Sequence, residues 1–88
     1  MNDSRNFFAD ELEKLLAMPL NTKQELDAWY SASKHLQDTI RSQYPEVDYE
    51  GETYHFLVDA EIRQRDPGYR KWQEGEVRHY IEKVRAQK

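Results

Sequence analysis

The sequence predicts an all-α fold, in which residues 1–88 form a single helical domain built as a small antiparallel bundle of about four helices. Three observations lead to this prediction. Apolar residues recur at helical spacing in four separate stretches, and prolines and glycines separate those stretches. No alternation of apolar and polar residues longer than four residues favours a strand. Short connections between the helices favour antiparallel neighbours.

The first predicted helix is capped by Asp3 or Ser4 and ends before Pro19, because the residue that precedes a proline is disfavoured in helical backbone. Asp10 lies four residues before Lys14, and we expect these two side chains to pair. The inward face consists of apolar residues at helical spacing: Phe8, Leu12, Leu15 and Leu16, with Phe7 beside them.

The second predicted helix has the clearest start. Thr22 and Glu25 form a T-x-x-E capping box, in which each side chain accepts from the backbone N–H of the other residue. The helix is expected to run for about 20 residues and to end at Pro45. Its inward stripe is Leu26, Trp29, Tyr30, Ser33, Leu36, Ile40 and Tyr44.

A continuous central helix is predicted that begins between Asp48 and Thr53, with Gly51 favouring a late start, and runs to Arg65; the rest of the chain is organised around it. Phe56 falls roughly opposite the centre of its apolar stripe, so either a second packed element covers this ring or it is exposed for a partner. The residues that share the face of this stripe are Tyr54, Leu57, Val58, Glu61, Ile62 and Arg65, and the predicted exposed side is His55, Asp59 and Arg63.

The last predicted helix begins at Pro67, with Asp66 as its N-cap, because the missing N–H of proline is not needed in the first helical turn. Gly75 lies inside this helix at a cost of about 1 kcal/mol relative to alanine, which indicates either close packing or a kink. The predicted inward residues are Tyr69, Trp72, Val77, Tyr80, Ile81 and Val84.

The composition describes a polar chain with a small aromatic core. It has 38% hydrophobic and 34% charged residues, with six tyrosines, three phenylalanines and two tryptophans. Dimerisation would bury additional apolar surface in such a protein. The lack of cysteine excludes disulfides, thiol catalysis and thiolate zinc sites. No signal peptide or run of about 18 apolar residues is apparent, so we expect a cytoplasmic protein without a membrane partner.

Charge is distributed unevenly along the chain. Residues 1–62 contain five basic and thirteen acidic residues, a net charge of −8, whereas residues 63–88 contain eight basic and four acidic residues, a net charge of +4. The acidic front and the basic back are therefore expected to attract each other or an oppositely charged partner.

Two patterns suggest chemistry but fit it poorly. Glu52-x-x-His55 and Glu76-x-x-His79 have the spacing of bundle metal ligands, yet both pairs lie away from the predicted inward faces, so no metal or other cofactor is expected. Histidines and serines are present, but there is no Gly-x-Ser-x-Gly turn and no glycine-rich phosphate loop. We therefore do not expect an enzyme.

The sequence best fits a small non-catalytic protein-binding or regulatory module, whose partner is another protein or a second copy of the chain as a homodimer. Its predicted binding surface is acidic and aromatic: Asp48, Tyr49, Glu50, Glu52 and Phe56. The alternative is nucleic-acid binding by the basic C-terminal part, which the overall acidity disfavours. That surface would be Arg63, Arg65, Arg70, Lys71 and Arg78, and a metal-binding bundle is a minor alternative.

Overall fold

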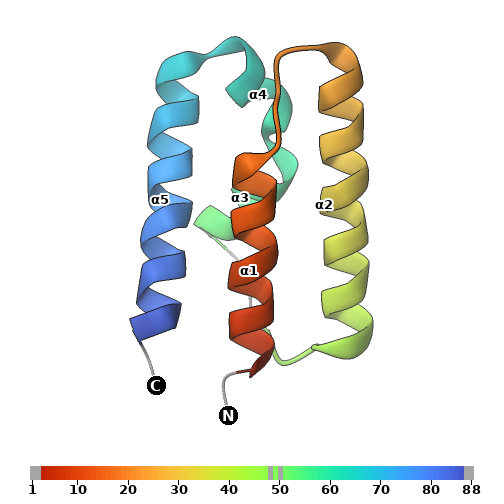
Figure 1. Cartoon of the computed structure of the whole chain (residues 1–88), viewed down its shortest axis with the longest axis vertical. Helices are drawn as coiled ribbons and strands as arrows, with labels where there is room; N and C mark the ends of the chain where they lie inside the picture. Colours follow the sequence, from red (N-terminus) through yellow and green to blue (C-terminus); the bar gives the residue numbers. More distant parts are fainter. Residues whose placement is uncertain (1–2, 48, 50, 87–88) are drawn as a thin grey trace.

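A computed structural model describes residues 3–47, 49 and 51–86, and it confirms the predicted all-α bundle (Figure 1). Five helices follow one another: α1 (Asp3–Ala17), α2 (Lys23–Gln43), α3 (Glu52–Val58), α4 (Ala60–Arg65) and α5 (Pro67–Ala86). The chain runs up α1, down α2, up through α3 and α4, and down α5 (Figure 1). Both α2 and α5 pack against α1, α3 and α4, so the bundle has four rods, of which the third is broken.

The helix boundaries follow from local signals that the sequence shows. The N–H of Glu25 donates to Oγ1 of Thr22 at 3.1 Å, and the N–H of Thr22 donates to Oε1 of Glu25 at 3.1 Å, which confirms the capping box. Asp66 caps α5 by accepting from the N–H of Tyr69 at 3.0 Å, and Pro67 is the first helical residue.

The core lies where α1, α2 and α5 meet the broken third rod. Trp29 of α2 is fully buried, its ring centre is 5.2 Å from that of Phe56, and its indole N–H donates to the carbonyl oxygen of Leu15 at 3.0 Å. The other buried apolar side chains among the described residues are Phe8, Ala9, Leu12, Leu15, Leu20, Leu36, Ile40, Val47, Leu57, Ala60, Val77, Ile81 and Val84. The inward stripes predicted for the first and second helices are confirmed for their central residues.

The third rod differs most from its prediction. The expected continuous helix is interrupted at Asp59, and its buried face is rotated. Tyr54 is 46% exposed and Val58 is 37% exposed, whereas Phe56 is 1% exposed. Of the two alternatives for Phe56, the structure shows the first: α2 covers this side of α3 and places Trp29 against the ring, so Phe56 is not exposed for a partner.

Two further predictions about surface side chains are wrong. Trp72 was expected to face inward, but it is 56% exposed on α5. Asp10 does not pair with Lys14, whose Nζ is 2.7 Å from the carboxylate of Glu11. Asp10 instead lies 2.7 Å from Nη2 of Arg85 on α5, because the two helices pack side by side and a guanidinium can bridge them.

Candidate functional site

The break between α3 and α4 deprives the last carbonyl groups of α3 of partners in a following helical turn. Side chains of α2 supply donors instead. The Ser33 hydroxyl donates to the carbonyl oxygen of Leu57 at 2.8 Å, and the Tyr30 hydroxyl donates to that of Val58 at 3.1 Å. The Tyr30 hydroxyl also accepts from the backbone N–H of Glu61 at 3.0 Å. Two residues of α2 therefore connect α3 to α4 across the break.

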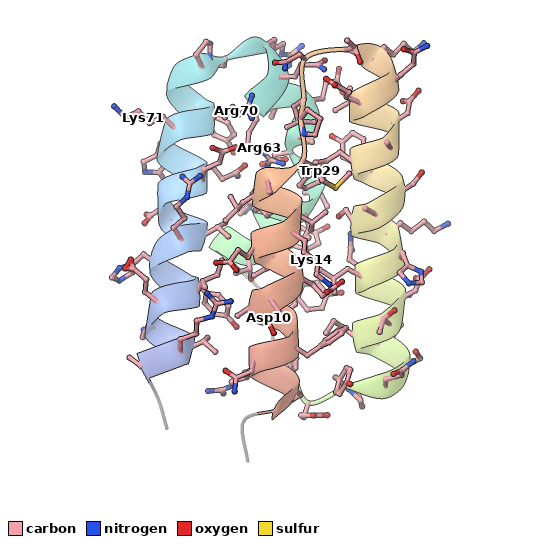
Figure 2. The ribbon with its side chains drawn as sticks, viewed as in Figure 1. Asp10, Lys14, Trp29, Arg63, Arg70 and Lys71 are labelled. Carbon is pink, nitrogen blue, oxygen red and sulfur yellow. The ribbon has the colours of Figure 1, made fainter. Side chains whose placement is uncertain are left out.

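Arg63, from inside the core, also donates to a carbonyl group at the end of α3. Its Nη1 donates to the carbonyl oxygen of Phe56 at 2.7 Å and to Oε1 of Gln73 at 2.6 Å. The guanidinium carbon lies 4.6 Å from the ring centre of Trp29 and 4.2 Å from that of Phe56, and Figure 2 shows Arg63 inside the bundle close to Trp29. Within the described part of the chain, Nε and Nη2 of Arg63 have no hydrogen-bond partner.

The prediction that Arg63 is exposed is therefore wrong, since only 1% of the residue is accessible. Burial lowers the pKa of Arg63 to about 10, because the charged form loses its hydration. The prediction followed the spacing of four residues that Arg63 shares with His55 and Asp59, away from the predicted stripe. The spacing of Arg63 from Phe56 and Ala60, seven and three residues earlier, instead puts it on their buried face.

A chain of hydrogen bonds leads from Arg63 to the surface. Gln73, whose Oε1 is held by Arg63, donates from Nε2 to the Tyr69 hydroxyl at 3.0 Å. The Tyr69 hydroxyl donates to Oδ2 of Asp59 at 2.9 Å. Burial and this bond to Asp59 raise the pKa of Tyr69. The buried cation is thus linked to a carboxylate through two neutral side chains, whose orientations are fixed.

This chain of hydrogen bonds borders a groove between α3 and α5. The groove encloses about 420 Å³, within the size range of small-ligand sites. Its lining combines aromatic rings, one amide, one carboxylate and a glycine: His55, Tyr69, Trp72, Gln73, Glu76 and Gly51. No lysine or arginine is among these lining residues.

Exposed aromatic rings continue from the groove onto both neighbouring helices. The rings of Tyr69 and Trp72 have centres 5.7 Å apart and are tilted by 43°. On the other side, the ring of Tyr54 lies 5.9 Å from that of His55. Tyr54, Val58 and Trp72 are the large apolar side chains that are exposed within the described part of the chain, and all three belong to α3 or α5.

The structure places the side chains of two of the five residues of the acidic and aromatic surface predicted from the sequence. Phe56 is in the core, and Tyr49 is half-buried with its ring centre 5.6 Å from that of Phe8. Asp48 and Glu50 lie outside the described residues, and so does the side chain of Glu52.

The cations of the predicted nucleic-acid surface do not form one patch. Arg63 is buried, and Glu74 holds two others, with Nε of Arg70 at 3.0 Å and Nη2 of Arg78 at 3.8 Å from its carboxylate. The remaining two, Arg65 and Lys71, are exposed, and Lys71 points away from α5 in Figure 2.

The acidic front and the basic back meet within the bundle. Nη2 of Arg85 lies 2.7 Å from the carboxylate of Asp10, and Nη1 lies 2.9 Å from that of Glu13. The hydrogen bond and the charge of Arg85 lower the pKa of Glu13. Some of the acidic residues of the front half are therefore paired with a basic residue of the back half, between α1 and α5.

Candidate metal ligands do not lie close together in the part of the chain that the structure describes. There, no group of three or more histidine, aspartate and glutamate side chains has the geometry to hold an ion. His55 and His79 are both exposed. The spacing Glu76-x-x-His79 therefore lies on the surface of α5 and not in the bundle core.

Trp72 and Gln73 are the groove residues whose roles sequence reasoning missed. Gln73 is buried between Tyr69 and Val77, each four residues away on the same face of α5. A polar residue on such an inward face indicates a buried hydrogen bond. Trp72 precedes Gln73 by one residue, so its side chain is rotated by about 100° from this inward face.

Comparisons with protein-family models, with curated protein sequences and with solved structures found no match. None of the helices in the described ranges has the length and apolar character needed to cross a membrane.

Proposed function

We propose that the chain is a small non-catalytic protein-binding module and that its docking face is the aromatic groove between α3 and α5. The observation that supports this proposal is the exposure of Tyr54 and Trp72, at 46% and 56%, on the two helices that border the groove. Exposed apolar patches mark interaction sites, and tyrosine and tryptophan are enriched among the few residues that dominate the binding energy of protein interfaces.

Rigid support beneath the groove favours the same function. Tyr69 is held by Asp59 and Gln73, and Gln73 is held by Arg63, so both lining side chains have fixed positions before a partner arrives. A pre-organised surface loses less conformational entropy on binding than a mobile one. Trp72 stands next to this fixed wall with its ring accessible.

The arrangement of polar groups supports binding better than catalysis. The hydroxyls of Ser33 and Ser42 each donate to a backbone carbonyl oxygen. Among the described residues, no hydrogen bond joins a serine hydroxyl to a histidine, which is the pairing that activates a serine nucleophile. Nucleic-acid binding is also less well supported, because the cations of α5 are largely engaged by carboxylates.

Site-directed photo-crosslinking in extracts of the native host tests the proposal. A photoreactive residue at position 54 reports on the docking face, and one at position 34, an exposed residue of α2, is the matched control. We expect a discrete crosslinked partner from position 54 only, and its loss in the Trp72→Ala variant. Because Trp72 is exposed, the variant should keep the melting temperature of the parent protein.

Equal crosslinking from positions 34 and 54, or crosslinking that survives Trp72→Ala, would contradict the proposed docking face. Light scattering after size exclusion, at low and high salt, identifies the partner class. A crosslinked product of twice the mass of the chain, together with a dimer in solution, would make the partner a second copy. A monomer in both salts would assign the surface to a different protein.

A further inference from the structure

We propose that the groove between α3 and α5 binds the side-chain cation of a lysine or arginine from a partner protein. This inference rests on the proposed function for its biological setting, but the chemistry of the site can be tested without the partner. It follows from the shape of the groove, its aromatic walls and the sign of the charge that lines it.

The walls of the groove suit an organic cation. The face of an aromatic ring carries negative partial charge and attracts ammonium and guanidinium groups. Tryptophan attracts them more strongly than tyrosine or phenylalanine. The rings of Tyr69 and Trp72 stand 5.7 Å apart at 43° to each other, and the imidazole of His55 lines the same space. Because all three rings line one space, a cation that enters the groove can contact more than one of them.

The charge at the groove has the matching sign. Among the described residues that line the groove, Glu76 is the charged side chain, apart from His55, which is charged only when protonated. A cation would thus meet the carboxylate of Glu76 in the groove, which favours its association.

One positive charge lies behind the groove wall and has to be considered. Arg63 contacts the amide oxygen of Gln73, but it does not line the groove. The carboxylate of Asp59, at the other end of the same chain of hydrogen bonds, offsets its charge. Glu76 is not engaged in any of the ion pairs of the described chain, so its charge is available to a ligand.

Blocked amino acids allow the cation to be tested directly by NMR. The probe is Nα-acetyl-lysine methylamide, its arginine counterpart is a second cation, and Nα-acetyl-norleucine methylamide is the neutral control of nearly equal size. The two tryptophans give two indole N–H signals. The indole of Trp29 is buried and bonded to Leu15, so its signal serves as an internal reference for that of Trp72.

At constant ionic strength and about pH 8, where histidine side chains are ordinarily neutral, we expect the lysine and arginine probes to shift the Trp72 indole signal. The signal of Trp29 should not move. Binding should saturate with a dissociation constant on the order of 10 mM, at least about three-fold tighter than for the norleucine control.

Two variants assign the effect to the groove. Glu76→Gln should weaken binding of the lysine probe by about three- to ten-fold and abolish the preference over norleucine. Glu82→Gln, an exposed glutamate of α5 that does not line this groove, is the matched control and should leave binding unchanged. Trp72→Leu, followed at the backbone amide of His55, should remove detectable binding because it deletes the aromatic wall.

The inference is overturned if norleucine binds as well as lysine, if Glu76→Gln has no effect, or if an acetylated glutamate probe binds better than either cation. Absence of any shift up to about 50 mM, five times the expected dissociation constant, would overturn it as well. These results are separable from those on the proposed function. Cation binding without a crosslinked partner would leave a small organic-cation site but no docking role, whereas a partner captured without cation selectivity would leave the docking role alone.

Discussion

Replacing Ser33 with alanine tests whether side chains of α2 hold the break between α3 and α4. The residue is 1% exposed, and its hydroxyl donates to the carbonyl oxygen of Leu57 at 2.8 Å. Without that donor, a buried carbonyl group is left unpaired, at a cost of about 1–3 kcal/mol. The higher helix propensity of alanine offsets roughly 0.5 kcal/mol of this loss in the free energy of unfolding. We therefore expect Ser33→Ala to lower the free energy of unfolding by about 0.5–2.5 kcal/mol.

The assay is a urea titration followed by far-ultraviolet circular dichroism, with a thermal melt as a second measurement. For a chain of this size, 1.5 kcal/mol corresponds to a fall in melting temperature of about 6–12 °C. Ser42→Ala is the matched control on the same helix, because Ser42 is exposed and its hydroxyl donates only to the nearby carbonyl of Thr39 at 3.3 Å. It should be neutral or slightly stabilising.

Hydrogen exchange then locates the damage. If the Ser33 hydroxyl holds the break, amide protons in α3 and α4 should exchange faster in Ser33→Ala than in Ser42→Ala under the same conditions. A variant at position 33 that is as stable as its control would refute the reasoning, because it would show that the Leu57 carbonyl finds another donor or does not need one.

Three further changes have defined outcomes. Gly75→Ala should raise the free energy of unfolding by about 1 kcal/mol in the same urea titration, because an added Cβ meets no atom within 4 Å; a destabilised variant would indicate a packing role for the glycine. Gly51→Ala should lower it by about 1–3 kcal/mol, since Gly51 has φ 72° and ψ −133°, and unchanged stability would show that the backbone can relax there. Tyr69 keeps its proton in the folded state at a pH where the unfolded chain loses it, so this residue should make stability fall as the pH rises past 10.0. Comparison of melts on both sides of that pH should give a shallower fall for Tyr69→Phe, and an equal fall would contradict the raised pKa.

The parts of the fold that the sequence predicts are those set by neighbours along the chain. Thr22 with Glu25, and Asp66 with Pro67, act over three residues or fewer, so the starts of α2 and α5 can be recognised without any tertiary information. The buried stripe of α2 is equally regular because α1, α3 and α4 cover one side of a long helix. Of the two features predicted for Gly75, close packing is not found, since an added Cβ would meet no atom within 4 Å, and α5 continues through this residue.

The third rod could not be predicted because its burial is decided by distant partners. Tyr54 and Val58 are more apolar than Arg63, yet they are exposed and Arg63 is buried. The cost of placing a guanidinium in the core is offset by the carbonyl of Phe56 and by two aromatic rings, one of which comes from α2. None of these partners is recognisable from helical periodicity, which considers only the spacing of apolar and polar residues along one helix.

The same contacts connect the stability of the bundle to the candidate site. Arg63 keeps two unpaired nitrogens in the core, a cost that a chain selected only for stability could avoid with an apolar residue. Its hydrogen bond to Gln73 fixes Tyr69, and Tyr69 forms the wall beside the exposed Trp72. The buried polar chain therefore has a consequence at the surface, because it positions the aromatic groove to which we assign the binding function. Changes at Arg63 should accordingly alter the groove as well as the free energy of unfolding, whereas changes at Ser33 act on the break between α3 and α4 without contacting the groove.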